Sequence, residues 1–221
     1  MINKIPDLTV IFLTVNRVPD KWAKFHKKVL LEAIGETPII TVSKKPLDWG
    51  TNLIQDAEPS IANIYRQILR AAKIAKTDYI AIAEDDTLYH RSHFEFKPPL
   101  DTFAYDYHRW GLFSWGKPIF YYKDRISNAA MIAPRKITIK SLETRFKLYG
   151  DQRISELGNE KGTRLERYKI MSFYPDVSMI YFSHVNSLDL TEQHKTKKKG
   201  AVQAIEIPYW GKASELQKKF K

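Results

Sequence analysis

Three consecutive carboxylates, Glu84, Asp85 and Asp86, directly follow an apolar run at 78–83. So much negative charge at the end of a buried strand is unfavourable unless a cation neutralises it. Mg²⁺ and Mn²⁺ prefer oxygen ligands and keep coordination positions open for phosphate oxygens. The triplet therefore predicts a divalent-metal site that handles a phosphorylated ligand, and an acidic turn without a metal is the alternative.

The elements before the triplet must bring it to a binding crevice. Three apolar runs rich in β-branched residues predict buried parallel strands at 8–15, 37–43 and 78–83. Between them, apolar residues recur at helical spacing after Pro19 and after Ser60, which can cap its helix. This βαβαβ order predicts an α/β fold with a Rossmann-like, mostly parallel sheet and flanking helices. Such sheets bind ligands beyond the carboxyl ends of their strands, which is where the triplet would lie.

The second half of the chain is less regular. Short strands are predicted at 110–115, 129–133 and 177–182, and a helix is predicted at 134–148. The charge-dense stretch 150–168 is typical of a mobile loop with a short helix. No repeat interrupts this order, so the chain is interpreted as a single domain.

Composition limits the possible classes of protein. The 221 residues are 43% hydrophobic and 28% charged, which supplies enough apolar side chains for one sizeable core. Because the chain has no cysteine, a metal would need carboxylate, imidazole or water ligands. No apolar stretch approaches the ~20 residues that span a bilayer, so we expect no transmembrane segment and a cytoplasmic protein.

The net charge of +11 is unevenly distributed along the chain. Residues 195–221 hold eight Lys and two Glu, a net charge of +6. A basic segment of this kind favours a polyanionic partner or an anionic surface. A tail that only increases solubility is an equal alternative.

Several of these features together resemble the GT-A fold glycosyltransferases, and specifically the glycosyltransferase 2-like enzymes. The shared order is a strand that ends at 14–17, a second strand, a helix that carries Asn-Ile-Tyr-Arg at 63–66, and a strand that runs into the triplet. The resemblance covers roughly the first 135 residues and the region of His184. It implies a nucleotide-sugar as donor substrate, and a UDP-sugar in particular.

The same resemblance divides the single domain into functional parts. It implies a nucleotide-sugar-binding half at 1–100 and an acceptor-binding half at 101–194. The basic C-terminal segment at 195–221 would follow them.

Each residue of the triplet also acquires a role through the resemblance. The family's Asp-any-Asp element falls on Glu84, Asp85 and Asp86. Glu84 or Asp85 would bond the nucleotide ribose, and Asp86 would hold a Mn²⁺ or Mg²⁺ ion that bridges the donor diphosphate. Glutamate in the first place departs from the commonest pattern, which leaves open which oxygen contacts the ribose.

Further donor-binding candidates lie in the first two elements. Thr14, Asn16 and Arg17 stand at the end of the first strand, where the family binds the nucleotide base, and a strand-end turn is the alternative. Asn63 and Arg66 lie three residues apart on one helix face. An arginine there could reach the diphosphate or the sugar hydroxyls, although a surface helix commonly carries such a pair.

A histidine could complete the metal site. His184 follows the predicted strand at 177–182, and the family often supplies a histidine late in the chain as a metal ligand, so we favour His184. His90 and His93 lie just after the triplet at helical spacing, in a stretch that also fits an exposed turn or the start of a helix.

Direct displacement of the donor's leaving group needs a base near the acceptor hydroxyl. Asp151 and Glu156 are the candidates, because the family's base often lies in the polar segment after the mid-chain helix. Surface ion pairing is the alternative for both residues, and more so for Glu156. An enzyme that retains the anomeric configuration would need no such base.

The acceptor is inferred from aromatic residues and charge. Aromatic side chains cluster between Phe103 and Tyr122, and with the Lys and Arg excess they form a mixture used on flipped nucleotides. The compact size, the absence of a membrane anchor and the basic balance resemble phage DNA-modifying glycosyltransferases. This resemblance implies a modified base in DNA as acceptor and the host cytoplasm as location. A saccharide or lipid-linked acceptor is one alternative. A metal-dependent nuclease or a DNA-binding module is an alternative from another class.

Overall fold

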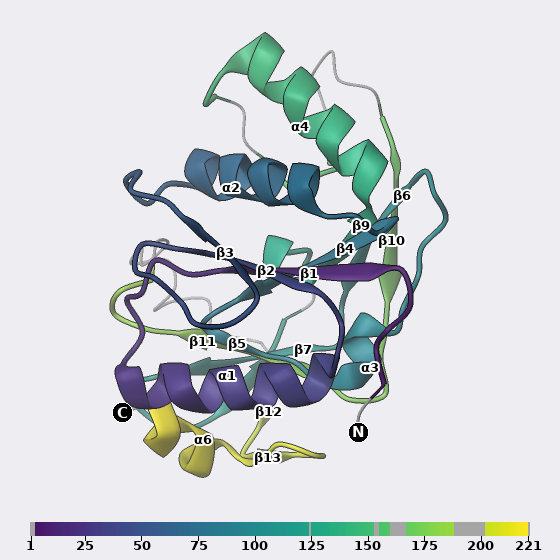
Figure 1. Ribbon diagram of the computed structural model, residues 1–221. Helices are drawn as coiled ribbons and strands as arrows, with labels where there is room; N and C mark the ends of the chain where they lie inside the picture. Colours follow the sequence, from purple (N-terminus) through teal and green to yellow (C-terminus); the bar gives the residue numbers. More distant parts are fainter. Residues whose placement is uncertain (1–2, 124, 153–154, 160–166, 188–201, 221) are drawn as a thin grey trace.

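The computed structural model describes residues 3–123, 125–152, 155–159, 167–187 and 202–220 (Figure 1). A seven-stranded sheet with the order β10-β6-β9-β4-β1-β2-β3 forms the centre. Its neighbouring strands are parallel except where β9 pairs with β4 and with β6. The strands are β1 (Leu8–Leu13), β2 (Ile39–Ser43), β3 (Thr51–Ile54), β4 (Tyr79–Glu84), β6 (Thr102–Asp106), β9 (Met131–Pro134) and β10 (Lys169–Phe173).

A second sheet of five strands has the order β12-β8-β7-β11-β5. In it β7 and β11 are parallel, and β5, which closely follows β4 in the chain, runs antiparallel to β11. A separate pair, β13 and β14, lies near the C-terminus. The strands are β5 (Thr87–Leu88), β7 (Arg109–Phe113), β8 (Phe120–Tyr122), β11 (Met179–Ser183), β12 (Gln203–Ala204), β13 (Glu206–Ile207) and β14 (Gly211–Lys212).

Helices cover both faces of the central sheet. In Figure 1, α2 and α4 lie on one face, whereas α1 and the second sheet lie on the other. The short helix α3 follows β5, and the 3₁₀ turn η1 directly precedes β9. The helices are α1 (Asp20–Ile34), α2 (Ile61–Ile74), α3 (Arg91–Phe94), η1 (Asn128–Ala130), α4 (Arg135–Tyr149) and α6 (Ala213–Phe220).

Helix α2 shows why these segments fold as they do. The Ser60 side chain accepts a hydrogen bond from the backbone N–H of Asn63, which caps the helix. Tyr65, Ile68 and Ala72 recur at helical spacing and are buried in the core between α2, α4 and the central sheet. Capping fixes where the helix begins, and burial of one face fixes its position on the sheet.

The predicted fold class is confirmed, because the central sheet is mostly parallel and helices flank it. The strands expected at 8–15, 37–43 and 78–83 are β1, β2 and β4, and the helix expected at 134–148 is α4. The strands expected at 110–115 and 177–182 are β7 and β11. Part of the stretch 150–168 and the lysines at 195–199 lie outside the described residues.

Three strands of the central sheet were not predicted from the sequence. Strands β3 and β10 lie at the two edges and are largely exposed, so they lack the continuous apolar run of a buried strand. Strand β6 is fully buried, but it begins with Thr102 and ends with Asp106. No helix among the described residues is long and apolar enough to cross a bilayer.

Candidate active site

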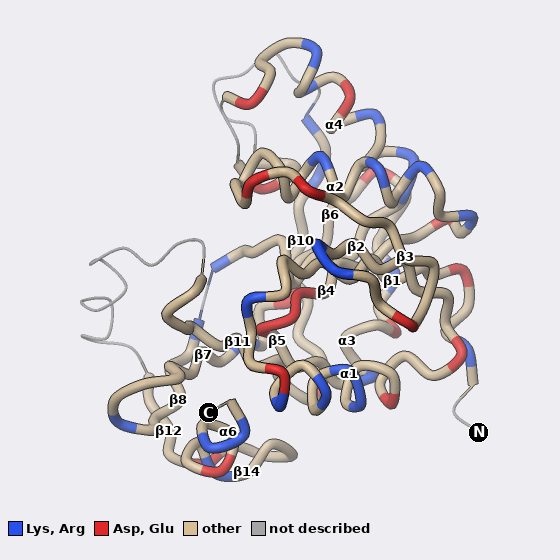
Figure 2. The backbone as a smooth tube through the Cα atoms, turned by 60° about the vertical axis from the view of Figure 1, so that its left-hand side comes forward, with Lys and Arg blue, Asp and Glu red and all other residues tan. Residues whose placement is uncertain are grey.

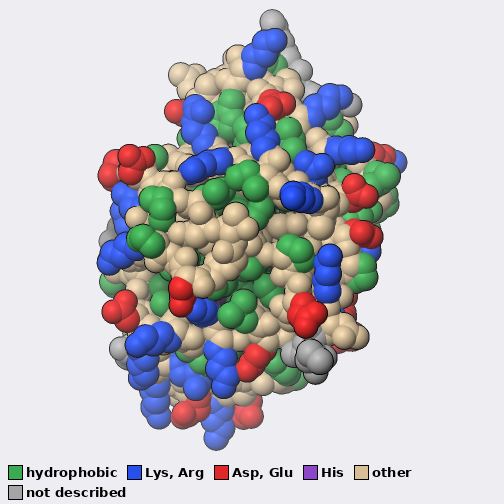
Figure 3. Space-filling model, viewed as in Figure 1, with side chains coloured by type: hydrophobic (Ala, Val, Ile, Leu, Met, Phe, Trp, Pro, Cys, Tyr) green, Lys and Arg blue, Asp and Glu red, His purple; other side chains and the backbone are tan. Residues whose placement is uncertain are grey.

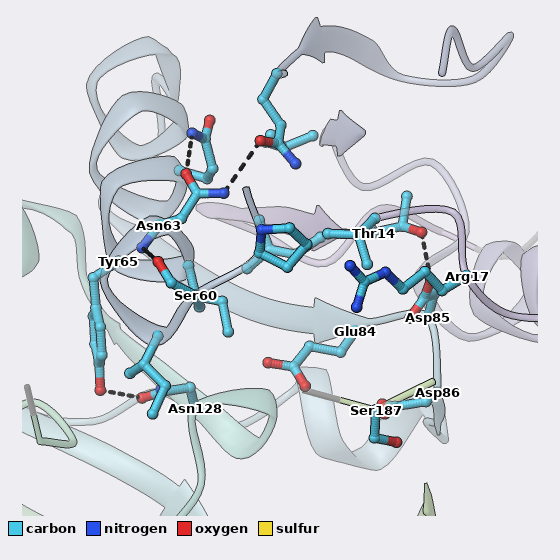
Figure 4. A pocket seen from close by; sticks show the side chains of 18 of the residues that line it. Thr14, Arg17, Ser60, Asn63, Tyr65, Glu84, Asp85, Asp86, Asn128 and Ser187 are labelled. Carbon is cyan, nitrogen blue, oxygen red and sulfur yellow. Dashed lines mark hydrogen bonds between the residues drawn. The ribbon is translucent and has the colours of Figure 1, made fainter. Parts of the chain in front are cut away.

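A cavity of about 310 Å³ opens beyond the carboxyl ends of β1 and β4 (Figure 4). The start of α2, the start of η1, the turn at 155–156 and the segment after β11 complete its walls. Eight of the eleven site residues expected from the sequence line it together. They are Thr14, Arg17, Asn63, Glu84, Asp85, Asp86, Glu156 and His184.

The acidic triplet forms one wall of the cavity. Burial and the charge of Asp85 raise the pKa of Glu84 to about 7. Burial raises the pKa of Asp85 to about 6, although a hydrogen bond from Thr14 opposes the shift. Burial and the charges of Glu84 and Asp85 raise the pKa of Asp86 well above its usual range. Each of these shifts reflects carboxylates that a nearby cation would stabilise in their charged form.

Buried side chains hold the acidic turn from behind. The Thr14 hydroxyl donates a hydrogen bond to the Asp85 carboxylate. From α1, the Trp22 indole donates to the Asp85 carbonyl at 2.7 Å, and His26 Nε2 donates to the Thr87 carbonyl at 2.8 Å. Trp22 and His26 are almost fully buried, so the turn is fixed by the packing of α1 against the second sheet.

Asp86 and His184 come together on this turn. His184 Nε2 lies 3.8 Å from Asp86 Oδ2, and both side chains are largely buried. Burial and the nearby charge of Arg17 lower the pKa of His184 to about 4, so its imidazole is neutral and has a lone pair to offer a metal. A neutral imidazole beside a carboxylate is a donor set that suits Mn²⁺. Within the described residues, no three His, Asp or Glu side chains converge on one metal position, so further ligands would come from substrate or water.

Arg17 extends this end of the cavity. It follows β1, and its carbonyl accepts a hydrogen bond of 3.2 Å from the Asn186 side chain, which belongs to the segment after His184. Figure 4 shows the Arg17 guanidinium on the same side of the cavity as Asp85 and Asp86. An exposed arginine next to a carboxylate and a neutral imidazole is an arrangement that can hold a diphosphate together with a cation.

Asn16 follows β1 as expected, but its side chain contacts another loop rather than the cavity. It adopts a left-handed backbone conformation with φ 56°, and it does not line the cavity. Its side-chain carbonyl accepts hydrogen bonds from the backbone N–H groups of Lys44 and Lys45 at 3.0 and 2.9 Å. Asn16 therefore ties the loop after β1 to the loop after β2, as the strand-end turn alternative requires.

A chain of three amides lines another part of the cavity. Gln67 Nε2 donates to Asn63 Oδ1 at 2.9 Å, and Asn63 Nδ2 donates to Gln55 Oε1 at 3.2 Å. The Gln67 carbonyl oxygen is buried without a hydrogen bond to the described residues. Gln55 and Gln67 were not identified from the sequence. Only the spacing of Gln67, one helical turn after Asn63, could have indicated it.

Glu156 lines the cavity, and the backbone carbonyls of the residues before and after it accept hydrogen bonds from other parts of the chain. The carbonyl of Ser155 accepts hydrogen bonds of 2.7 Å from the Tyr65 hydroxyl and 2.7 Å from Arg145 Nη1. The carbonyl of Leu157 accepts a bond of 2.7 Å from the Tyr105 hydroxyl. Arg145 and Tyr105 are fully buried, and Tyr65 is 1% exposed. Three interior side chains therefore fix the turn that carries Glu156.

Arg66 and Asp151 pair with each other away from the cavity. Arg66 Nη2 lies 2.6 Å from Asp151 Oδ1, and about half of each side chain is exposed. Neither residue is among those that line the cavity. The surface ion pairing weighed as the alternative for Asp151 is the contact observed, and its partner is Arg66.

The two histidines after the triplet take part in local structure. His93 Nδ1 lies 2.8 Å from Asp106 Oδ2, and both side chains are buried outside the cavity. His90 caps α3 by accepting a hydrogen bond from the N–H of Ser92. Of His90, His93 and His184, only His184 lines the cavity with the triplet.

Comparisons with known proteins give partial similarities of fold. No protein-family model matches the chain, and no curated protein matches it. A glycosyltransferase involved in the glycosylation of the major capsid of PBCV-1 is 10% identical, with a TM-score of 0.42 over 80% of this chain and 93% of that one. HddC from Yersinia pseudotuberculosis is 14% identical, with a TM-score of 0.47 over 78% and 92% of the two chains.

A third solved structure contains a metal and a donor. The mannosyltransferase PcManGT from Pyrobaculum calidifontis, in complex with GDP-Man and Mn²⁺, is 15% identical, with a TM-score of 0.46. The alignment covers 79% of this chain and 56% of that one. Each of these TM-scores is below 0.5, so the similarities assign no family to the chain.

Proposed function

We propose that the protein is a metal-dependent glycosyltransferase that moves a sugar from a nucleotide-sugar, a UDP-sugar, to an acceptor hydroxyl. The observation that carries the proposal is the pair Asp86–His184, 3.8 Å apart, beside Arg17 in one cavity with Glu84 and Asp85. This combination supports binding of a cation and a diphosphate at the same place. The motif order along the chain, which resembles that of GT-A enzymes, supports the sugar as the rest of the ligand.

The chain's own residues have distinct roles in this proposal. Asp86 and His184 would hold Mn²⁺ or Mg²⁺, and the bound ion would supply positive charge for the diphosphate leaving group. Arg17 bonds the diphosphate from the cavity mouth. Glu84 or Asp85 accepts a hydrogen bond from the ribose.

The nucleotide base is assigned to the part of the cavity that lies away from Arg17. Asn63 lines this part, and the amide chain of Gln55, Asn63 and Gln67 supplies polar groups there. Thr14, which bonds Asp85, lines the cavity on the side of Arg17. Leu13 and Val42 supply apolar surface in the same cavity. Planar bases are commonly held by this combination of apolar walls and a few oriented polar groups.

Glu156 is the proposed base that takes the proton from the acceptor hydroxyl. It lines the cavity, and its flanking carbonyls are anchored by buried side chains, which supports a fixed position next to the substrate. Asp151, the other candidate, pairs with Arg66 outside the cavity, so we assign it no role in proton transfer. The favoured acceptor is a modified base in DNA, with a saccharide or lipid-linked hydroxyl as the alternative.

A melting experiment with Mn²⁺ and UDP tests the proposal. Saturating ligand should raise the melting temperature of the wild-type protein by about 5–10 °C. Asp86→Asn should abolish this rise, because the side chain keeps its shape and loses its charge, and His184→Ala should reduce it. Asp56→Asn, which removes an exposed carboxylate outside the cavity, is the matched control and should respond like wild type. An equal rise in wild type and Asp86→Asn would contradict the metal site.

Activity separates the proposal from the other class of function. The protein is incubated with Mn²⁺, several nucleotide-sugars and DNA, and the products are analysed for free nucleotide and for cut DNA. Release of UDP without DNA cleavage supports the transferase. Cleavage of the DNA while the nucleotide-sugar stays intact would identify a nuclease instead.

A further inference from the structure

The exposed side of helices α2 and α4 is strongly basic. The two helices contain eight Lys and Arg and one acidic residue, a net charge of +7 out of +11 for the whole chain, and all of the eight except Arg145 have side chains that are not buried. By the same count, α1 has a net charge of +2 and α6 of +1. The basic excess of the folded part is therefore concentrated on one pair of helices.

Helical spacing arranges these charges in rows. On α2, Arg66, Arg70 and Lys73 lie four and three residues apart and are exposed. On α4, Lys136, Lys140 and Lys147 are exposed and repeat with the same periodicity, four and seven residues apart. Residues with this spacing share one face of a helix. We call these six residues the basic face.

The two rows lie next to each other. Lys73 Nζ of α2 lies 2.6 Å from Glu143 Oε1 of α4, and the Arg66 guanidinium lies 4.3 Å from the Phe146 ring. Figures 2 and 3 show Lys and Arg gathered over α2 and α4. Two carboxylates pair with this face, Glu143 with Lys73 and Asp151 with Arg66, so the six cations keep an excess of four positive charges over these two acids.

The chemistry of the basic face fits a nucleic-acid backbone. Successive cations four residues apart are separated by a rise of about 6 Å along the helix. Each can therefore reach a different phosphate of a strand that rises about 3.4 Å per nucleotide. Helices that dock on lipid insert an apolar face. Here that face is used internally, because Ile68 of α2 and Leu142 of α4 are buried in the core.

The basic face also adjoins the cavity. Ser60 and Asn63, at the start of α2, line the cavity (Figure 4). Arg66, which pairs with Asp151 outside the cavity, follows Asn63 by three residues. A polyanion that lies along α2 and α4 would therefore pass the cavity opening. This geometry relates a backbone-binding surface to the place where the acceptor would react.

We propose that the basic face binds the phosphate backbone of duplex DNA and presents the acceptor to the cavity. The binding is electrostatic and independent of sequence, because the contacts are to phosphates. Presentation of the acceptor rests on the proposed transferase function. Binding of DNA to the basic face requires neither a nucleotide-sugar nor a metal.

Two triple variants of equal charge test the proposal. One replaces Lys136, Lys140 and Lys147 of α4 with Gln. The control replaces Lys21, Lys24 and Lys28 of α1, which are exposed at comparable helical spacing on the other side of the central sheet. Binding of a labelled 16-base-pair duplex is measured by fluorescence anisotropy between 50 and 200 mM NaCl.

The α4 variant should bind DNA at least about tenfold more weakly at 50 mM salt, and its salt slope should fall by up to about 2.7, or 0.9 for each lost phosphate contact. The α1 variant should stay within about threefold of wild type. Equal losses in both variants, or wild-type binding by the α4 variant, would overturn the proposal. So would loss of binding to phosphatidylserine vesicles in the α4 variant with DNA affinity unchanged.

The melting response to Mn²⁺ and UDP is measured on the same three proteins. It should be equal in all of them, because none of the six lysines lines the cavity. If the wild type shows no response, the proposed function fails, while the DNA-binding result remains valid by itself. If all three respond and the α4 variant keeps DNA affinity, only the basic-face proposal fails.

Discussion

The indole of Trp22 donates a 2.7 Å hydrogen bond to the backbone carbonyl of Asp85. Trp22 belongs to α1 and is fully buried, with Phe182 and Phe220 packed on its ring at centroid distances of 4.4 and 4.8 Å. Asp85 belongs to the acidic turn at the cavity. One interior side chain therefore links the packing of the second sheet to the geometry of the turn.

Replacement of Trp22 by Phe tests this link. The variant keeps an aromatic ring but leaves the Asp85 carbonyl without its donor and removes volume from the core. We expect the free energy of unfolding to fall by about 2–4 kcal/mol, measured by urea denaturation. We also expect a smaller rise of melting temperature with Mn²⁺ and UDP, because the turn is less well fixed.

Trp210 offers a matched control for this prediction. Its indole donates a 2.6 Å bond to the Ser178 carbonyl and does not line the cavity. Trp210→Phe should lose stability and keep the full response to Mn²⁺ and UDP. A full response in Trp22→Phe as well would show that the bond to Asp85 has no influence on the metal site.

Asp86→Asn should not destabilise the protein when metal is absent. Burial and the charges of Glu84 and Asp85 raise the pKa of Asp86, so the charged form is unfavourable in the folded state. At pH 8 without divalent ions, we expect the free energy of unfolding to stay equal or to rise by about 1–2 kcal/mol. A clear loss of stability in urea denaturation would indicate that the carboxylate is a structural group.

His26 should make stability depend on pH. Burial lowers its pKa from 6.5 to about 4, so between these values the unfolded state binds more protons than the folded state. Stability from this group is complete above pH 6.5 and is lost as the pH falls toward 4, by about 3 kcal/mol in total. The raised pKa values of Glu84 and Asp85 act in the opposite direction, so a comparison with a variant is needed.

His26→Gln provides that comparison, because Gln can still donate to the Thr87 carbonyl but does not titrate. The carboxylates titrate in both proteins, so the difference in free energy of unfolding isolates His26. Urea denaturation at pH 7.5 and pH 4.5 should show this difference shift by about 2–3 kcal/mol in favour of the variant at the lower pH. Parallel pH profiles would contradict a neutral, buried His26.

Tyr105 should influence sugar transfer through Glu156. Tyr105→Phe removes the hydroxyl that bonds the Leu157 carbonyl and leaves the turn less well positioned. We expect kcat for transfer to fall about 3- to 10-fold while the Kd for UDP with Mn²⁺ stays unchanged. Glu156→Gln should retain UDP binding and lose transfer by about 100-fold or more.

Tyr79→Phe is the control for the tyrosine prediction. The Tyr79 hydroxyl bonds the Pro98 carbonyl at 3.1 Å, outside the cavity. This variant should keep kcat for transfer. Equal losses of kcat in the two variants would mean that Tyr105 acts only through overall stability.

The part of the site that follows continuous strands could be predicted from the sequence. Strand β4 is an uninterrupted apolar run, so its end located Glu84, Asp85 and Asp86 at the crevice. His184 was located in the same way, because it directly follows β11. In both cases local pattern and sheet geometry point to the same edge.

Contacts between distant loops could not be predicted in this way. The pairing of Arg66 with Asp151 joins residues 85 positions apart, and nothing in either local pattern specifies it. The amide chain from Gln55 to Asn63 depends on how the loop after β3 lies against α2. Strand β6 escaped detection because Asp106, a charged residue, is fully buried there and is paired with His93.

The direction of β9 has a consequence for how this protein can diversify. Because β9 runs antiparallel to β4, its first residues rather than its last lie near the cavity, and η1 delivers Asn128 to the cavity wall. Asn128 thus reaches the cavity from a 3₁₀ turn that precedes β9 and lies outside the β4–β9 ladder. The side chain at position 128 can therefore change while the pairing register of β4 with β1, and the acidic turn that follows β4, stay as they are. The shape of this wall of the cavity can thus vary independently of the acidic turn.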